Sequence, residues 1–432
     1  MDKHIPQFYR DYGRYINRSR AFPSELDGLK VVERRVLLSA YETCKDSFAK
    51  SSKLVGYVIG EYHPHGDSAA YGTVVQLVHQ NFLDKQGNFG SNIGIEPCEA
   101  SAHRYTEVKL NANIKKIAFN LIEYVHREDS ELEAEPPFLP TMYPFCIMGT
   151  EYTVGIGFGY KTVIPCYAQE DLKKRLLYLI GKTKKSPIIR PISNCDIISK
   201  DKVLMELLTV GKCAVEFKGQ YVIDREHHKV SIKSLPPGKS FDKLFSKLKT
   251  EFDSGEIGYA DLSEKNETNV VIEVTRQRNK DEIFNKFLEK LDPLLIGQVS
   301  FEIIVVGKDG KVRNISVDEL LLTVFNNFKN VTRDSIHIEI QKLNLKLEDY
   351  ILLNKIKPHL IELLKTVNDF DHICKIISDN IKEDVKKISD IMIKYNIKKL
   401  VTSTFDVSEL QTEKTRLENL LIDLDNYVIL QY

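Results

Sequence analysis

The sequence of 432 residues lacks the marks of a disulfide framework, a membrane protein or a nonspecific polyanion binder. Its seven cysteines are scattered and form no CxxC pair, so we expect reduced thiols in a cytosol-like compartment and no zinc site. No apolar run approaches the roughly 18 residues of a membrane helix, and "MDKHIPQFYRDYGRY" has no apolar core of a secretory signal. Lys plus Arg equals Asp plus Glu, at 61 each, which argues against a basic nucleic-acid coat.

The basic side chains are nevertheless unevenly distributed. The stretch 14–35, "RYINRSRAFPSELDGLKVVERR", holds six Arg and Lys residues against three acids. A solvated helix face is the ordinary explanation of such a run, and a local surface for a polyanion is the other. Hydrophobic residues make up 42% of the chain, which is typical of a globular protein, and the length allows two or three domains.

The first region, 1–140, is predicted to be a mixed helical unit with a late hairpin. "KVVERRVLLSAYETC" has helical spacing, and a second helix is expected over 69–80 with Asp67 or Ser68 as its N-cap. "LDKQGNFGSNIGIEP" is a loop or hairpin, and "SAHRYTEVKL" is a possible strand. This arrangement suits a winged helix-turn-helix, which lays one helix and a β wing against DNA.

Two further regions complete the predicted multidomain α/β plus α architecture. Region 141–330 alternates like strands in "CAVEFKGQYVI" and "VSFEIIVVGKDGKVRNISV", with helices such as "DEIFNKFLEKL" between them. We therefore expect an α/β domain with a mixed sheet. Region 331–432 is predicted to be an antiparallel coiled coil with a helical head. Its two apolar seams are Ile336, Ile340, Leu343, Leu347 and Tyr350, and Leu410, Leu417, Leu421, Leu424 and Val428.

One tyrosine, Tyr105 in "AHRYTEV", follows an arginine directly, just downstream of "QGNFGS". A free tyrosine titrates near ~10, so ionising it at pH 7 costs roughly 4 kcal/mol, which neighbouring cations or a base can supply. On a strand, Arg104 and Tyr105 would face opposite sides, so a loop or bulge is needed to aim both at one target. The pair alone is a weak signal for a nucleophile.

Two other motifs have both an ordinary and a functional explanation. "YHPHGDS" is either a capped helix with two surface histidines or a phosphate site at a helix N-terminus, and His63 and His65 have no further zinc ligand at suitable spacing. "GIGFG", 155–159, is either a β-bulge or a glycine frame that presents an apolar wedge to base steps. "HH" at 227–228 is expected to be solvated.

These motifs occur in an order that resembles a known family. "SRAFPSELDGLKVVERRVL", "VGYVIGEYHPHGDSAAYGT", "QGNFGS", "RYTEVKL" and "GIGFGYKTVIP" are similar to the breakage–reunion subunit of type IIA DNA topoisomerases. That family includes the gyrase A subunit, its topoisomerase IV counterpart and phage medium subunits. The resemblance covers nearly the whole chain. It implies a winged-helix domain over 1–140, an α/β tower domain over 141–330, and a coiled-coil dimerisation domain over 331–432.

The resemblance also implies a chemistry. Tyr105 would attack a DNA phosphodiester and become linked to the 5′ end of the broken strand, so that resealing needs no ATP. Two subunits would cut both strands of one duplex, and a second duplex would pass through. Arg104, Arg20 and His65 match the family's residues at the scissile phosphate, and Ile156 matches the isoleucine that bends the duplex. The residues that match DNA contacts are Lys30, Arg34, Arg35, His63 and Ser68.

The sequence departs from the family pattern at a few positions. Val31 and Glu33 replace a proline and a histidine that are common in the bacterial enzymes, which bears on local DNA contacts. Ser68 is kept from the pair that anchors quinolone drugs, whereas Gly72 replaces the usual acidic partner. We therefore predict weak quinolone sensitivity.

Further expectations follow from motifs that the sequence lacks. It has no EGDSA-plus-DxD motif of the metal-binding TOPRIM domain and no GHKL-type ATPase sequence. Mg²⁺ and ATP are therefore expected on a partner protein, with no metal on this chain, and activity is expected from a heteromer built on a homodimer. Without a DNA-wrapping domain, relaxation and decatenation are expected rather than negative supercoiling. The expected location is the cytoplasm, at the nucleoid or in a host cell if the protein is phage-like.

Two alternatives remain open at the level of sequence. One is a winged-helix DNA-binding or architectural protein that has kept the scaffold and lost the chemistry, although Tyr105, Arg104, Arg20 and His65 are all present. The other is a tyrosine recombinase. The early position of the tyrosine, followed by a coiled coil, disfavours that class.

Overall fold

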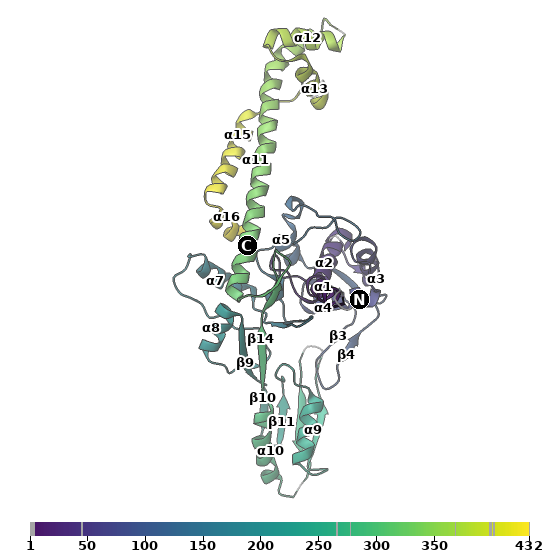
Figure 1. Ribbon diagram of the computed structural model, residues 1–432, viewed down its shortest axis with the longest axis vertical. Coiled ribbons are helices and arrows are strands. Elements are labelled where there is room, and N and C mark those ends of the chain that lie inside the picture. Colours follow the sequence, from purple (N-terminus) through teal and green to yellow (C-terminus); the bar gives the residue numbers. More distant parts are fainter. Residues whose placement is uncertain are drawn as a thin grey trace. The chain divides into compact units, whose positions relative to one another are not determined.

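The structure is a computed structural model, and it describes residues 5–431 except 45, 265–266, 277, 368, 397–399 and 401. The chain is a mixed α/β protein with long C-terminal helices, and it forms two compact units, Met1–Phe328 and Lys329–Tyr432. Figure 1 shows both units as ribbons coloured along the chain. Within the described residues, no helix combines the length and the apolar character that crossing a membrane would require.

The N-terminal part of the first unit is a helical cluster with a small sheet. Its helices are α1 (Ile5–Ile16), α2 (Val31–Cys44), α3 (Ser51–Tyr57), α4 (Asp67–His79) and α5 (Ala112–Phe119), with π-helical turns η1 (Asn17–Ala21) and η2 (Val58–Tyr62). Strands β1 (Ala49–Lys50), β5 (Glu107–Leu110) and β2 (Leu83–Gln86) pair antiparallel in that order. Buried apolar side chains at helical spacing, such as Val36 and Ala40 of α2 and Val74 and Leu77 of α4, form the core between the helices.

Two local predictions in this part need correction. Helix α4 begins at Asp67 rather than at residue 69, and Gly66 occupies the N-cap without a side-chain hydrogen bond. The carboxylate of Asp67 instead accepts a hydrogen bond from the Ser68 N–H at 2.9 Å, inside the first turn. The possible strand "SAHRYTEVKL" is interrupted, because strand β4 (Cys98–Ala100) ends before a turn and β5 starts after it.

Strand β4 forms a hairpin with β3 (Phe89–Ser91), and the loop of this hairpin reaches a second sheet. The Ile95 N–H donates to Oδ2 of Asp261 at 2.8 Å, and the Ile95 side chain packs against the hydrophobic core beneath that sheet. Gly94 has a φ of +85°, and a Cβ there would lie 2.6 Å from Asp261 Oδ2. The hairpin is therefore seated on strand β12 (Ile257–Asp261) by close contacts.

The rest of the first unit contains two sheets with helices beside them. One has the antiparallel order β10 (Tyr221–Asp224), β11 (Lys229–Ile232), β13 (Val270–Val274) and β12, and its core also includes α9 (Phe241–Glu251) and α10 (Lys280–Leu294). The other has the order β6 (Thr153–Ile156), β7 (Lys161–Ile164), β14 (Ile296–Glu302), β9 (Lys212–Lys218) and β8 (Asp196–Ile197). The first unit also contains three helices, α6 (Phe145–Met148), α7 (Gln169–Leu179) and α8 (Asp201–Val210). Strands β15 (Ile304–Val306) and β16 (Val312–Asn314) form a further hairpin in it.

The second unit consists of helices. Helix α11 (Val317–Leu363) runs into it from the first unit, and α12 (Phe370–Ile381), α13 (Val385–Tyr395), α15 (Val407–Ile422) and α16 (Leu424–Gln431) follow. Helices α12 and α13 share an apolar core with the end of α11. Helices α15 and α16 return alongside α11 (Figure 1), and Lys329 pairs with Asp425 at 2.9 Å. Ile336, Leu347, Leu424 and Val428 of the predicted seams are buried.

Candidate active site

A hollow of about 530 Å³ lies where η1, the start of α2 and the turn before α4 meet. Five of the residues predicted for catalysis or DNA contact line it, namely Arg20, Lys30, Arg35, His63 and His65. The first comes from "SRAFP", the next two from "LKVVERR" and the last two from "YHPHGD", so the fold brings together three motifs that are separate in the sequence. All five are basic or can carry a proton, and they share the lining with the carboxyl groups of Glu33 and Glu131.

Arg35 is fixed at the wall of this hollow by a carboxylate and a histidine. Its Nε and one terminal nitrogen donate to Glu135, with the shortest contact at 2.7 Å, and Glu131 lies 3.7 Å away. Its other terminal nitrogen lies 2.9 Å from Nδ1 of His63. A guanidinium has donors only, so Nδ1 of His63 must accept this hydrogen bond. The ring is therefore neutral, with its proton on Nε2.

The surroundings of His63 favour that neutral form. Burial lowers the pKa of His63 to about 4, and His65 and Arg35 act in the same direction. The two histidine rings are stacked, with centroids 4.1 Å apart and planes inclined by 18°. At neutral pH, His63 can therefore offer an uncharged N–H donor to a ligand of the hollow.

Lys30 immediately precedes α2 and Glu33 lies in its first turn, and both line the hollow. Glu33 Oε2 accepts from the Lys30 N–H at 2.9 Å, which caps the helix, and Oε1 accepts from Gln76 at 3.3 Å. Burial raises the pKa of Glu33, although Lys30 opposes this. The Lys30 ammonium donates to the Val154 carbonyl at 2.8 Å, so it ties α2 to strand β6.

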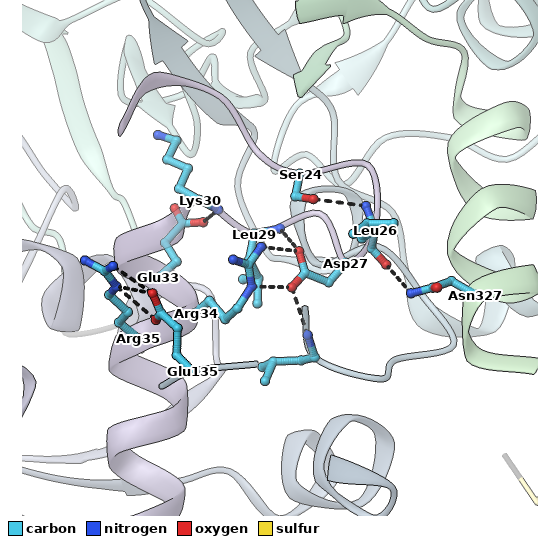
Figure 2. A network of polar contacts seen from close by, with 11 residues as sticks. Ser24, Leu26, Asp27, Leu29, Lys30, Glu33, Arg34, Arg35, Glu135 and Asn327 are labelled. Atoms are coloured by element: carbon cyan, nitrogen blue, oxygen red, sulfur yellow. Dashed lines mark hydrogen bonds and ion pairs between the residues drawn. The ribbon is translucent and has the colours of Figure 1, made fainter. Parts of the chain in front are cut away.

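Arg34 lies beneath the hollow and is not part of its lining. Figure 2 shows its guanidinium facing the carboxylate of Asp27, and both side chains are buried. Arg34 donates to Asp27 at 2.7 and 3.1 Å, and the N–H groups of Leu29 and Leu139 donate to the same carboxylate at 3.0 Å. The structure thus gives Arg34 an internal carboxylate partner, where the sequence predicted a DNA contact.

Tyr105 lies on the turn between β4 and β5, and 66% of its surface is exposed. Its N–H donates to the Ala102 carbonyl at 2.9 Å, and Arg104 Cζ lies 4.7 Å from the centre of its ring. Because the segment is a turn and not a strand, the two neighbours lie on the same side. Arg104 and Tyr105 are both outside the lining of the hollow.

A second tyrosine pins the turn that carries Tyr105. The Tyr71 hydroxyl, on α4, donates to the Ser101 carbonyl at 2.6 Å and lies 3.0 Å from the Thr106 hydroxyl. Thr106 is fully buried, and its hydroxyl donates to Ser51 at 2.8 Å. Both ends of the turn are therefore fixed to helices, and Tyr105 projects from a turn held at both ends. The sequence reasoning missed Tyr71, although its place one turn after "HPHGDS" was a usable signal.

Ile156 projects from the end of β6, with 73% of its surface exposed. The glycines on either side of it permit close packing. A Cβ on Gly155 would lie 2.3 Å from the Ala21 carbonyl oxygen, and one on Gly157 would lie 2.7 Å from the Phe22 ring. The glycine frame thus seats an exposed apolar side chain on the "SRAFP" segment.

The remaining predicted positions lie on α4 or on surface turns. Ser68 and Gly72 are exposed on α4, and Gly72 lines the hollow whereas Ser68 does not. His227 and His228 lie in the turn before β11 and pair with Asp224 and Asp281. Across the described residues, no group of three or more His, Cys, Asp or Glu side chains could hold a metal ion.

Comparison with known proteins places these features in a family. Residues 20–426 match the family of the A subunit of DNA gyrase and topoisomerase IV. The DNA gyrase A subunit of Ureaplasma parvum is 28% identical over 96% of this chain and 49% of its own length. Its counterpart in Neisseria gonorrhoeae is 31% identical over 74% of this chain and 37% of its length. The chain spans about half the length of the curated relatives it matches.

Proposed function

Because the chain belongs to the family of gyrase and topoisomerase IV A subunits, we propose that it is the DNA-cleaving subunit of a type IIA DNA topoisomerase. The observation that carries the proposal is the exposed Tyr105 hydroxyl on a turn pinned at both ends, beside the Arg104 guanidinium. A nucleophile in phosphoryl transfer must be accessible and held in line with the bond that breaks. The turn leaves Tyr105 accessible and is held at both ends, which supports its assignment as the nucleophile.

The proposed reaction exchanges one phosphodiester for another. The Tyr105 oxygen attacks the phosphorus and loses its proton, the bond from phosphorus to the 3′ oxygen breaks, and that oxygen takes up a proton. The 5′ end stays linked to the tyrosine, and the reverse attack reseals the strand without ATP. Because a phosphodiester is conserved at each step, the break is transient.

The hollow is proposed to bind the phosphate during this exchange. Arg20 supplies positive charge, Arg35 orients the His63 ring, and Nε2 of His63 and the ring of His65 supply hydrogen bonds to the phosphate oxygens. Since Tyr105 lies outside the hollow, we propose that DNA and the assembled homodimer bring the two parts together. Lys30 ties α2 to β6, and Arg34 acts from below by holding α2 to Asp27.

The larger parts of the chain have proposed roles in the same cycle. The helices and small sheet of 1–140 act as a winged helix on the duplex, and Ile156 of the tower domain, 141–330, enters the base stack and bends it. The helical region 331–432 is proposed to form the dimer contact. A partner with TOPRIM and ATPase domains would supply Mg²⁺ and ATP, and the assembly would act on double-stranded DNA in the cytoplasm.

Covalent trapping tests the proposal directly. The affinity-tagged chain is incubated with plasmid, Mg²⁺ and a native lysate that supplies the partner, then denatured and captured by its tag. We expect tag-linked, linear DNA from the wild type and none from Tyr105→Phe. Tyr259→Phe, which alters another exposed tyrosine, is the matched control and should give wild-type adduct.

The two other outcomes would each contradict one part of the proposal. No adduct from the wild type, with DNA binding intact, would favour an architectural protein that has lost the chemistry. Adduct from Tyr105→Phe would show that a different residue is the nucleophile. Because only DNA attached to the tag is counted, a topoisomerase of the lysate cannot produce either signal.

A further inference from the structure

Asn17, in the π-helical turn η1, makes two hydrogen bonds to one residue of a distant hairpin. Its Oδ1 accepts from the Phe158 N–H at 2.7 Å, and its Nδ2 donates to the Phe158 carbonyl at 3.1 Å. The residue is buried, with 5% of its surface exposed. A buried amide that satisfies both groups of one peptide residue imitates the pairing of a β-strand, and its replacement leaves two polar groups unpaired.

The hairpin fits around this amide closely. Gly157 lies between Ile156 and Phe158, and a Cβ on it would lie 2.2 Å from Asn17 Oδ1. The Phe158 ring makes edge contacts with Tyr9 and Tyr12 of α1, at centroid distances of 5.4 and 5.8 Å. The tip of the β6–β7 hairpin is therefore held on the N-terminal segment by polar and aromatic contacts together.

This contact joins two parts of the proposed active site. Asn17 is three residues before Arg20, which lines the hollow, and Phe158 is two residues after Ile156, which is exposed at the hairpin tip. We infer that Asn17 is a positioning residue, which sets the place of the Ile156 wedge relative to the Arg20 phosphate site and so determines how far the duplex is bent. The inference rests on the proposed function, because it assumes that Ile156 enters the base stack.

The physical reason lies in the cost of bending DNA. Bending a site of 20–30 base pairs by 40–90° is opposed by several kcal/mol of elastic energy. The Ile156 side chain can hold the duplex bent only if the hairpin that carries it is not displaced. Ile156 stands on a short hairpin, and the two Asn17 hydrogen bonds resist displacement of that hairpin from η1. Without these hydrogen bonds, Ile156 would still be present, but the hairpin that carries it would be displaced before the base step opened.

The test uses Asn17→Leu, which keeps the size of the side chain and removes both hydrogen bonds without adding charge. The full chain is bound to a 30-base-pair duplex with a fluorophore at each end, and energy transfer is measured at saturating protein. We expect the ratio of bent to straight duplex to fall roughly thirtyfold, as for the loss of two ordinary hydrogen bonds. Gly157→Ala should act similarly, because its Cβ displaces the Asn17 amide.

Two controls separate positioning from a general loss of structure. Asn113→Leu removes an exposed asparagine that donates to Gln169 at 3.0 Å, and it should leave the bend unchanged. Ile156→Ala removes the wedge itself, and the double variant Asn17→Leu/Ile156→Ala closes a cycle. If Asn17 acts through Ile156, the double variant bends the duplex no less than Ile156→Ala alone.

The outcomes distinguish the inference from the function on which it rests. If the wild type does not bend the duplex, or if Ile156→Ala bends it as the wild type does, the wedge is refuted. If Ile156→Ala loses the bend and Asn17→Leu keeps it, the wedge stands and the role of Asn17 is refuted. Additive losses in the double variant would also refute it, because Asn17 would then act by a separate route.

Discussion

The buried pair of Arg34 and Asp27 gives a quantitative prediction, for which the perturbation is Asp27→Asn. The two oxygens of Asp27 receive four donors, two from Arg34 and one each from the N–H groups of Leu29 and Leu139. Asparagine has the same shape and one oxygen only. Its amide nitrogen would face two donors, and the buried guanidinium would lose its counter-charge.

The expected cost follows from the energetics of buried ion pairs. Removing one partner of such a pair typically destabilises a protein by about 3–5 kcal/mol, since the other charge remains in a poorly solvated place. Asp27 is fully buried, and Arg34 is nearly so. We therefore expect Asp27→Asn to lower the free energy of unfolding of the first unit by about 3–5 kcal/mol.

Urea unfolding followed by far-ultraviolet circular dichroism measures this cost. The matched control is Asp46→Asn, because Asp46 pairs with Lys115 at 2.6 Å with an 84% exposed side chain. An exposed pair contributes about 0–1 kcal/mol. If Asp27→Asn cost no more than Asp46→Asn, the argument that Arg34 is an internal anchor would be refuted.

Three further predictions concern the site. Tyr71→Phe removes the hydroxyl that donates to the Ser101 carbonyl, so adduct formation should slow severalfold while the affinity for the duplex stays unchanged. An unchanged rate of cleavage would contradict the argument that Tyr71 holds the turn in place. The His63 ring should titrate near pH 4 when followed by NMR. Because folding lowers the pKa of His63 from 6.5, the stability of the fold should decrease as the pH falls from 6.5 towards 4. A titration midpoint near 6.5 would contradict this. A Cβ on Gly72 meets nothing within 4 Å, so Gly72→Asp should fold normally and increase quinolone-stabilised cleavage beside Ser68, and equal drug response in both proteins would contradict that pairing.

Sequence periodicity is sufficient to predict a helix whose apolar residues recur at regular spacing. Helix α2 spans 31–44, close to the predicted segment, because its apolar residues recur at helical spacing. The role of its charged residues could not be obtained in that way. Arg34 and Arg35 are adjacent in sequence, yet one is buried on Asp27 and the other lines the hollow beside Glu135. Their partners lie 7 and 100 residues away, and a local pattern contains no information about them.

The turn of Tyr105 shows the same limit. The sequence predicts "SAHRYTEVKL" only as a possible strand, and Tyr and Thr do favour extended structure. The segment turns because Tyr71 and Ser51, from two helices, bind its ends. Motif order in the sequence indicated which residues belong to the site, and only the packed structure separates those that line the hollow from those that stand apart.

The seat of the β3–β4 hairpin on strand β12 has a consequence for sequence variation. Surface loops usually tolerate insertions, and this one reaches its partner with a left-handed glycine, one backbone hydrogen bond and one packed side chain. An added residue between Ser91 and Cys98 would shift Ile95 off the sheet and remove the hydrogen bond from its N–H to Asp261. Exchange of this loop with that of a relative should therefore succeed only when strand β12 is exchanged with it. We therefore expect the two segments to change together, although Ile95 and Asp261 are 166 positions apart in the chain.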